Sequence, residues 1–180
     1  MNKKILNSQI CVNCQADIAA PFVCNGCEDV IEITPDIDYF DLFGIPHTID
    51  VDTKAVQTAY INLQSALHPD RFTNKSFKAQ QTAMRNSSII NGGYKVLSNK
   101  FECAQYLVAK HTSESIVPAD FMALSFEWHE LKFEGKDLTD EIATVETSLW
   151  QDLKLATKTK DWREAGVLIA KLKIIKRFKN

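Results

Sequence analysis

The chain has 180 residues, of which 45% are hydrophobic and 24% are charged, and its formal net charge is −2. This length suits one or two small domains, and this composition argues against bulk disorder. A slightly acidic chain is a poor candidate for a nucleic-acid binder that neutralises phosphates, and no apolar run approaches the roughly 18–20 residues of a membrane span. We therefore expect neither a nucleic-acid nor a membrane partner.

The chain begins with MNKKILNS, which carries two lysines and no acidic residue. This stretch is too short for an ordinary secretory signal. It is either a very short organellar targeting segment or simply a polar start, and its sequence does not distinguish the two.

Four of the five cysteines form two C-x-x-C pairs, Cys11 with Cys14 and Cys24 with Cys27. Without a secretory signal, a disulfide framework is the weaker interpretation. Two such knuckles, with nine residues between them, can present four thiolates tetrahedrally to one Zn²⁺. The segment is too small for a core of its own, so the metal would supply folding free energy. We expect structural zinc without an open position for catalysis; iron, a redox dithiol and disulfides are the alternatives.

The fifth cysteine, Cys103, lies alone in a helical region, where we expect an ordinary packed thiol. Between the cysteine module and the helices, Thr34-Pro35-Asp36 is expected to be a linker. The following stretch, DIDYFDLFGIP, predicts a short helix and turn that anchor a hydrophobic core. Its apolar cluster consists of Tyr39, Phe40, Leu42, Phe43 and Ile45, closed by Gly44 and Pro46.

The next two helices form a predicted hairpin. The first has its N-cap at Asp52 or Thr53 and an apolar face of Val56, Tyr60, Leu63 and Leu67. Pro69 ends it, because the ring disfavours helical geometry at His68. The second spans about 76–97, with a stripe of Ala83, Ser87, Ile90, Tyr94 and Leu97. Two such helices joined by a loop pack antiparallel, so His68-Pro69-Asp70 is expected at an exposed tip.

A polar stretch at 111–118 marks a second boundary, and three further helices are predicted at about 119–134, 138–158 and 161–177. The last begins at Asp161, with Glu164 placed for a capping box. We therefore predict an all-α fold with a tetracysteine module at 1–35, a domain built on the helical hairpin at 36–112 and a three-helix bundle at 113–180.

The hairpin with HPD at its tip resembles the J domain of DnaJ-type co-chaperones. The stretches DYFDLFGIP, LQSALHPDRF, INGGYKVLS and AQYLV are more specific and resemble the J domain of HscB, the co-chaperone for iron–sulfur cluster biogenesis. The helices after Pro118 suit that family's C-terminal bundle, and the tetracysteine module is similar to the one on its eukaryotic members. The resemblance covers essentially the whole chain.

In this family the HPD loop is presented to a DnaK-type chaperone (HscA or its mitochondrial counterpart) and favours ATP hydrolysis. The resemblance therefore implies a chaperone-binding site at His68, Pro69, Asp70 and Arg71. Pro69 fixes the backbone, Asp70 can pair with a partner arginine, and His68 offers a donor and an acceptor nitrogen. The alternative is that HPD is only a turn that stops a helix.

The first and last helices of the C-terminal region each have a second apolar stripe opposite the predicted core face. On 119–134 the core face is Phe121, Leu124, Trp128 and Leu131, and the second stripe is Met122, Phe126 and Phe133. On the last helix the core face is Trp162, Ala165, Leu168, Ile169, Leu172 and Ile175, and the second stripe is Val167, Ile174 and Phe178. A three-helix bundle needs one apolar face per helix, so these stripes either pack against the J domain or bind a client.

The resemblance favours the client, because HscB relatives bind the scaffold protein IscU through these two helices. Matched position by position, the family's contacts fall on Met122, Ala123, Phe126, Glu127, Glu130 and Ile174. Ala123 and Ile174 are smaller than the usual residues, and His129 stands where arginine is common, so client affinity is expected to be distributed differently here.

The chain also departs from the J-domain pattern. Lys54 is the only basic residue on the helix before HPD, so electrostatic steering of the chaperone is expected to be weak or shifted to the basic residues after the loop. These are Arg71, Lys75, Lys78 and Arg85. Near the end of the J domain, Lys100 and Cys103 replace the family's usual proline and arginine, and Gly93 replaces a usual alanine, which favours a looser end to that helix.

We interpret the chain as a non-enzymatic co-chaperone, with a generic J-protein for a different client as the alternative. His68 and Asp70 are a poor acid–base pair, since they flank a proline on an exposed tip with no pocket or nucleophile implied. A nucleic-acid-binding zinc module would need basic and aromatic residues near the cysteines, and only Lys3 and Lys4 lie upstream. The resemblance implies the mitochondrial matrix or a related organelle, with the cytosol as the alternative.

Overall fold

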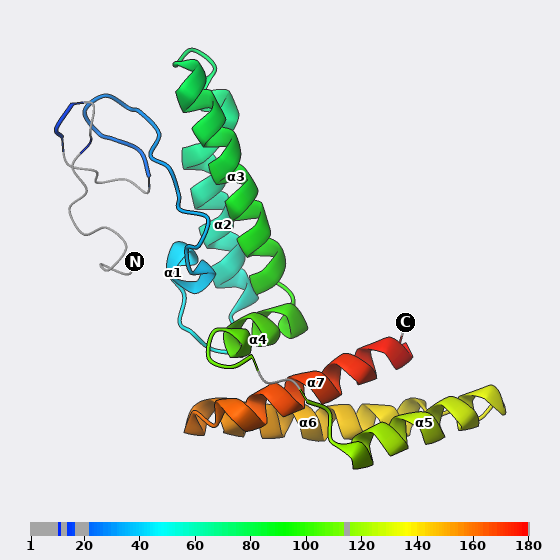
Figure 1. Cartoon of the computed structure of the whole chain (residues 1–180). Coiled ribbons are helices and arrows are strands. Elements are labelled where there is room, and N and C mark those ends of the chain that lie inside the picture. The colour runs from blue at the N-terminus through cyan, green and yellow to red at the C-terminus, as the bar shows by residue number, and fades with distance from the viewer. Residues whose placement is uncertain (1–10, 12–13, 17–21, 114–115, 180) are drawn as a thin grey trace. The chain divides into compact units, whose positions relative to one another are not determined.

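The computed structural model describes residues 11, 14–16, 22–113 and 116–179; the start of the chain, with Lys3 and Lys4, lies outside them. Apart from one isolated antiparallel bridge between Val23 and Val30, the regular secondary structure in these ranges is helical (Figure 1). The predicted all-α fold is confirmed. The chain divides into two compact units, residues 1–103 and 104–180. None of the helices described is both long and apolar enough to cross a bilayer.

Helix α1 (Tyr39–Phe43) is the short helix predicted from DIDYFDLFGIP. The Asp38 side chain caps it by accepting a hydrogen bond from the Phe40 N–H at 2.8 Å, and Gly44 ends it in the left-handed conformation. Phe40 and Phe43 are buried and belong to the core of the N-terminal unit. Because Asp38 and Gly44 fix both ends of one turn, these aromatic rings are held against the hairpin that follows.

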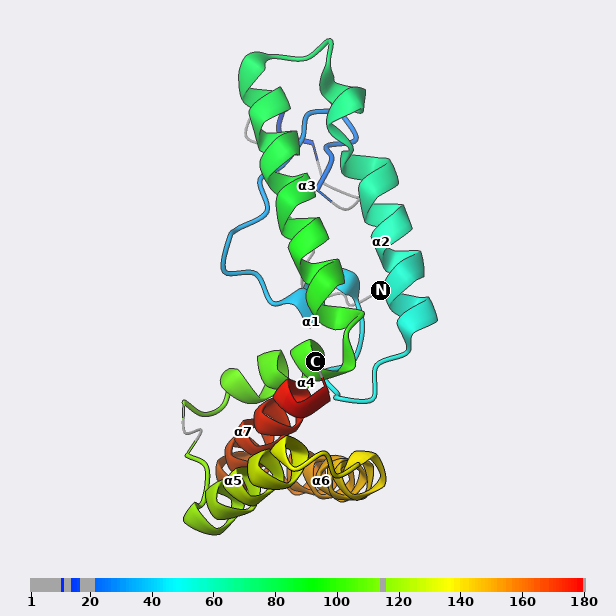
Figure 2. The same cartoon turned by 90° about the vertical axis from the view of Figure 1, so that its right-hand side faces the viewer.

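Helix α2 (Thr53–Leu67), the 3₁₀ helix η1 (Pro69–Phe72) and helix α3 (Phe77–Leu97) form the predicted antiparallel hairpin (Figure 2). Asp52 caps α2 and Ser76 caps α3 through their side chains. The predicted apolar faces meet in the core, where Val56, Leu63, Leu67, Ala83, Ile90 and Leu97 are buried. Burial of each large aliphatic side chain contributes about 1.5–3 kcal/mol, so this face holds the hairpin together.

A polar network joins α2 to α3 beside this core. The Tyr60 ring stacks on Tyr94, with 4.3 Å between centroids. The Tyr60 hydroxyl and the Gln64 amide both donate to Asn91 Oδ1, at 3.0 and 2.8 Å. Ser87 donates to Gln64 Oε1 at 3.3 Å. These directional contacts fix which turns of the two helices face each other.

Helix α4 (Lys100–Ala109) follows α3 and crosses the division between the two units. The Asn99 side chain caps it by accepting from the N–H groups of Phe101 and Glu102, both at 3.0 Å. Cys103 is buried and its Sγ lies 3.8 Å from the Thr48 carbonyl oxygen, as expected for a packed thiol.

The C-terminal unit contains α5 (Ala119–Phe133), α6 (Thr139–Thr159) and α7 (Trp162–Lys179), each within two residues of its predicted bounds. Asp161 accepts from the Glu164 N–H at 3.0 Å, which is the first of the two bonds of the predicted capping box at the start of α7. Trp128 of α5 is fully buried, contacts Phe121 and Phe178 edge to face, and donates from Nε1 to Glu141 of α6 at 2.8 Å. This one side chain therefore links all three helices.

Helical spacing predicts an outer position for Phe178, and this prediction is wrong. Phe178 is only 7% exposed. Its ring lies 5.6 Å from Trp128 and 4.4 Å from His129, and its carbonyl accepts from Lys132 Nζ at 3.0 Å. Because α5 and α6 contact two different sides of α7, the buried part of α7 is wider than one apolar stripe.

Candidate functional site

The two C-x-x-C pairs fold as knuckles with the same backbone pattern. In the first knuckle, the Cys11 carbonyl accepts from the Gln15 N–H and the Cys11 N–H donates to the Ala16 carbonyl, both at 2.9 Å. In the second, Cys24 makes the same two bonds with Glu28 and Asp29, again at 2.9 Å. The residue after each second cysteine, Gln15 or Glu28, is left-handed, with φ of 59° and 55°. The repeated pattern points both pairs of thiols at a common centre.

The four sulfur atoms of Cys11, Cys14, Cys24 and Cys27 lie within 4.8 Å of one another. Cys11 Sγ is 3.6 Å from Cys27 Sγ, and Cys14 Sγ is 3.3 Å from Cys24 Sγ. A disulfide needs about 2.05 Å, whereas a tetrahedron with Zn–S bonds of about 2.3 Å has edges of about 3.8 Å. The four-thiol donor set and its spacing therefore fit one tetrahedral metal ion such as zinc.

The backbone of the second knuckle favours the ligating form of its first thiol. Hydrogen bonds from the N–H groups of Cys27 and Gly26 lower the pKa of Cys24 to about 6. Gly26 is also required sterically, because a β-carbon there would lie 2.7 Å from the Ala16 Cβ. The two knuckles are thus in close contact as well as similarly folded.

The segment after the second knuckle is attached to α3 by a residue that sequence reasoning missed. The Asn86 side chain is fully buried; its Nδ2 donates to the Ile31 carbonyl at 2.7 Å, and its Oδ1 accepts from the Ile33 N–H at 2.9 Å. One amide thus satisfies two backbone groups of another segment. In the sequence, Asn86 is notable only as a polar residue on the apolar side of its helix. That observation does not identify a partner more than fifty residues away.

The HPD turn is exposed and partly ordered by its own histidine. His68 has φ −61° and ψ 134°, outside the helical region as predicted. Its Nδ1 accepts from the Asp70 N–H at 3.3 Å and lies 3.5 Å from Asp70 Oδ2. Since Nδ1 acts as acceptor, the neutral ring carries its proton on Nε2. The turn therefore offers one N–H donor and a carboxylate that is 86% exposed.

Arg71 and Phe72 fasten this turn to the hairpin. The Arg71 guanidinium donates to the Ser65 carbonyl at 3.0 Å, satisfying a group at the C-terminal end of α2. Phe72 is 3% exposed and adds its ring to the core. Of the predicted chaperone-binding residues, Arg71 thus has a local structural contact, while the side chains of His68 and Asp70 are 52% and 86% exposed.

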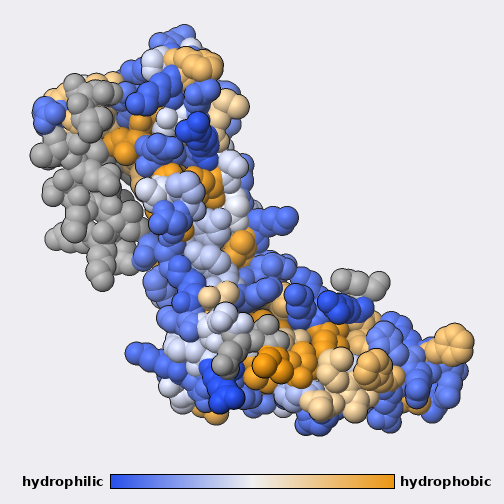
Figure 3. Space-filling model, in the orientation of Figure 1, coloured by the Kyte–Doolittle hydropathy of each residue, from blue (hydrophilic) through white to orange (hydrophobic). Residues whose placement is uncertain are grey.

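The residues predicted to bind a client lie along one exposed side of α5. Met122, Ala123, Phe126, Glu127 and Glu130 are exposed, and Phe133 continues the row at 95% exposure. Figure 3 shows apolar side chains gathered on the C-terminal unit. Ile174 is half-buried and lies one turn before Phe178, whose ring contacts His129 of α5. We use the name α5–α7 surface for Met122, Ala123, Phe126, Glu127, Glu130 and Phe133 of α5 together with Ile174 of α7.

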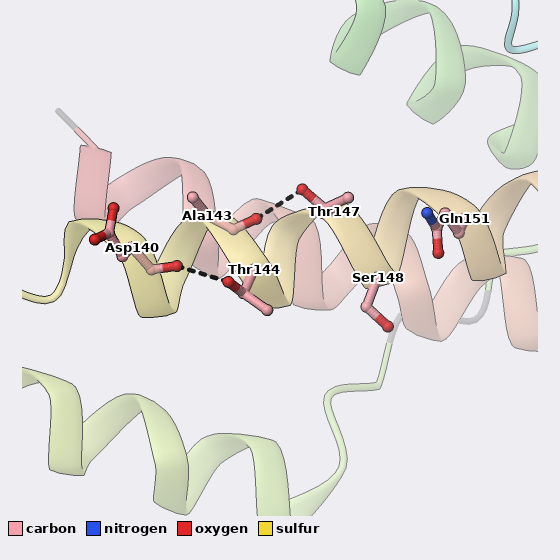
Figure 4. Close-up of a pocket in the computed structure, with 6 residues that line it drawn as sticks. All are labelled: Asp140, Ala143, Thr144, Thr147, Ser148 and Gln151. Atoms are coloured by element: carbon pink, nitrogen blue, oxygen red, sulfur yellow. Dashed lines mark hydrogen bonds between the residues drawn. The ribbon is translucent and has the colours of Figure 1, made fainter.

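A shallow hollow of about 580 Å³ also lies over α6 (Figure 4). It is lined by Asp140, Ala143, Thr144, Thr147, Ser148 and Gln151. The Thr144 and Thr147 hydroxyls donate to the carbonyls of Asp140 and Ala143 in their own helix, both at 2.8 Å. This lining contains no histidine, cysteine or lysine, so it offers a binding shape without an activated nucleophile.

Comparison with known proteins identifies relatives over most of the chain. No family model matches it. The co-chaperone protein HscB homolog of Neisseria meningitidis serogroup A is 29% identical over 157 residues, which cover 79% of this chain and 95% of that protein. The homolog of Shewanella pealeana is 31% identical over 130 residues, covering 67% and 75% of the two chains.

Solved structures show the same fold. The crystal structure of human co-chaperone protein HscB superimposes with a TM-score of 0.85 at 22% identity, covering 95% of each chain. HscB from Vibrio cholerae gives a TM-score of 0.71 at 23% identity and covers 80% of this chain and 94% of its own. Together with the tetracysteine module and the HPD turn, these relationships show that the chain belongs to the HscB family of co-chaperones.

Proposed function

We propose that this protein is a non-enzymatic J-type co-chaperone of iron–sulfur cluster assembly. In this role it binds an IscU-type scaffold protein, stimulates the ATPase of a DnaK-type chaperone, and so assists cluster transfer. One observation carries the proposal. This member of the HscB family has an exposed HPD turn on its N-terminal unit and exposed apolar side chains along α5 of its C-terminal unit.

The HPD turn supplies charge and direction for the chaperone contact. The exposed Asp70 carboxylate can pair with a partner arginine, and the Nε2–H of His68 can donate to a partner carbonyl or carboxylate. Pro69 restricts the backbone between them, so little conformational entropy is lost on docking. Such a turn can favour one arrangement of an ATPase without taking part in its chemistry.

The α5–α7 surface supplies apolar area for the scaffold. Phe126 is 62% exposed and Met122 37%, and the exposed residues Glu127 and Glu130 lie on the same side of α5. An apolar centre with charged residues around it is typical of protein interfaces. The acidic residues favour a scaffold surface with basic side chains opposite them.

The four thiols would hold one structural zinc ion. Bound there, zinc supplies folding free energy to a segment in which the described residues include few that are buried, chiefly Cys11, Cys24, Val30 and Ile33. The presence of the tetracysteine module supports the mitochondrial matrix or a related organelle as the compartment, with the cytosol as the alternative.

The proposal is tested with purified components. The chain is used to pull down an IscU-type scaffold, and the ATPase rate of a DnaK-type chaperone is followed with the chain, the scaffold and both. We expect scaffold binding and stimulation that is greatest with both present. Stimulation without scaffold binding would identify a generic J-protein with another client, and the absence of both would overturn the proposal.

A further inference from the structure

Lys75 connects the second cysteine knuckle to the turn that follows HPD. Its Nζ donates to the Cys27 carbonyl oxygen at 3.3 Å and lies 3.8 Å from Glu28 Oε2. Cys27 is the last of the four thiols, and Glu28 is the left-handed residue that completes the knuckle. The lysine therefore contacts the backbone that positions a metal-binding sulfur, although it lies 48 residues further along the chain.

The backbone of Lys75 is tied to the HPD turn just as directly. Its N–H donates to the Phe72 carbonyl at 2.9 Å. The Gln80 side-chain amide donates to the carbonyls of both Thr73 and Lys75 at 3.0 Å. Phe72, the last residue of η1, is buried. A displacement of Lys75 is therefore transmitted to η1, which carries Pro69 and Asp70.

The position of this contact gives it a distinct role among the attachments of the cysteine module. A hollow of about 690 Å³ lies between the second knuckle and the end of α2 with η1, and Lys75 is one of the residues that line it. Asn86 and Arg85 hold residues 31–33 against α3, where Arg85 is 3.4 Å from Glu32. Asn86 and Arg85 therefore attach the module to α3 at a place away from the HPD turn.

We propose that Lys75 is a positioning residue that couples metal binding in the cysteine module to the presentation of the HPD turn. This inference rests on the proposed co-chaperone function. With metal bound, the knuckle holds the Cys27 carbonyl and the Glu28 carboxylate in place, and both restrain Lys75. Without metal the knuckle loses its main source of folding free energy, so Lys75 is released and the turn explores more conformations.

The coupling must act in both directions. If metal binding restrains the turn through Lys75, then Lys75 must strengthen metal binding by the same factor. The contact is only partly shielded, since the Lys75 side chain is 36% exposed and that of Glu28 is 80% exposed. Contacts of this exposure change an equilibrium by roughly two- to fivefold.

The experiment uses the full-length protein, zinc-loaded or stripped by a chelator under reducing conditions. Lys75→Met removes the contact, Lys75→Arg preserves a donor and a charge, and Arg85→Met removes a matched cation that contacts the module away from the turn. Three readouts are taken: the rate of zinc transfer to a chromogenic chelator, hydrogen exchange across residues 69–75, and the co-chaperone concentration for half-maximal ATPase stimulation. Circular dichroism checks that each variant is folded.

In the zinc-loaded protein, Lys75→Met is expected to raise the zinc-transfer rate and the half-maximal concentration roughly two- to fivefold and to speed exchange in the turn. Arg85→Met should leave exchange in the turn unchanged, and Lys75→Arg should restore most of the loss. In stripped protein, wild type should already behave like Lys75→Met, and the substitution should add nothing.

Two results would overturn the coupling. Zinc transfer and exchange that do not respond to Lys75→Met would show that the contact transmits nothing. A loss of stimulation of the same size in loaded and stripped protein would instead make Lys75 a direct chaperone contact. If no DnaK-type chaperone is stimulated even by wild type, the proposed function fails, while zinc transfer and exchange still decide the coupling.

Discussion

Gly93 of α3 lies so close to Phe43 of α1 that a β-carbon on the glycine would be 2.7 Å from the ring carbon Cε2. The same β-carbon would be 3.0 Å from Cδ1 of Tyr39. The sequence favours a looser helix end at this glycine, yet α3 continues without interruption to Leu97. Gly93 instead provides the space in which the short helix α1 packs against the hairpin.

Gly93→Ala is therefore expected to destabilise the protein although alanine is the better helix former. Helix propensity favours alanine by about 1 kcal/mol, whereas overpacking a well-packed core costs about 1–3 kcal/mol. The two contributions leave about 0–2 kcal/mol, and we expect a net loss near the middle of this range, about 1 kcal/mol, in the free energy of unfolding measured with urea.

Two further variants test the cause of this loss. Phe43→Leu should make Gly93→Ala less damaging, because the smaller side chain relieves the close approach. Gly92→Ala is the neighbouring control, since its β-carbon would meet the end of the Tyr39 side chain at 3.3 Å from the hydroxyl and 4.0 Å from Cζ. Gly93→Ala variants as stable as wild type would contradict the packing argument.

The cysteine module should hold one zinc ion per chain through Cys11, Cys14, Cys24 and Cys27. Elemental analysis measures the metal, and thiol titration before and after chelation measures its ligands. We expect four thiols to become reactive on chelation, together with faster hydrogen exchange in residues 22–33, since the metal stabilises this fold. A folded, metal-free module with four freely reactive thiols would rule out the zinc site.

His68→Gln should abolish stimulation of the chaperone ATPase while leaving helicity and scaffold binding unchanged. The side chain is 52% exposed, so its replacement should change stability by no more than about 0.5 kcal/mol. Steady-state ATPase assays measure stimulation, and circular dichroism measures helicity. Normal stimulation by this variant would show that the HPD turn does not act as proposed.

Met122→Ala combined with Phe126→Ala should weaken scaffold binding by roughly tenfold or more, because each buried side chain contributes about 1.5–3 kcal/mol before ordering costs and each decade of affinity is about 1.4 kcal/mol. Isothermal titration calorimetry measures the affinity. The melting temperature should change little, since both side chains are exposed.

Trp128→Ala is the matched control on the buried side of α5. It removes a fully buried indole that contacts Phe121 and Phe178, so it should lower stability by about 3–5 kcal/mol. Unchanged scaffold affinity in the double variant, with a large loss of melting temperature, would show that Met122 and Phe126 pack inside the protein.

Cys103 should resist alkylation in the folded protein. Burial raises the pKa of its thiol to about 11, against 9.0 for an ordinary cysteine, so at pH 8 only about 0.1% is thiolate. Iodoacetamide labelling followed by mass spectrometry should find Cys103 unmodified until urea is added. Unfolded chains lose this proton near pH 9 and folded chains near pH 11, so this thiol's contribution to stability falls as the pH rises through that window. Rapid labelling of native protein would contradict the burial.

The helices and the two motifs could be predicted because their signals are local. Asp52, Ser76 and Asp161 cap the helices they precede, and Pro69 ends α2, so the predicted bounds lie within two residues of those observed. The cysteine spacing and the HPD tripeptide were equally local, and the structure brings the four thiols together and exposes the turn.

Contacts between distant segments could not be predicted in this way. Asn86 occupies a helical position whose partner is a backbone stretch 53 to 55 residues earlier. Lys75 has no unusual neighbours in the sequence and is distinguished only by its contact with the second knuckle. The prediction for Phe178 is wrong because a helical wheel treats one helix at a time. It does not show that α7 has two neighbouring helices, of which α5 contacts the Phe178 ring.

Asn91 gives the hairpin a mechanical property that its apolar core alone would not. One side-chain oxygen of α3 accepts from both Tyr60 and Gln64 of α2. A slide of one helix past the other by a single turn, about 5.4 Å, would break both bonds at once, whereas aliphatic side chains can exchange neighbours gradually. Axial force on α2 should therefore pass directly to α3, so that the two helices move as one rod with the HPD turn at its end.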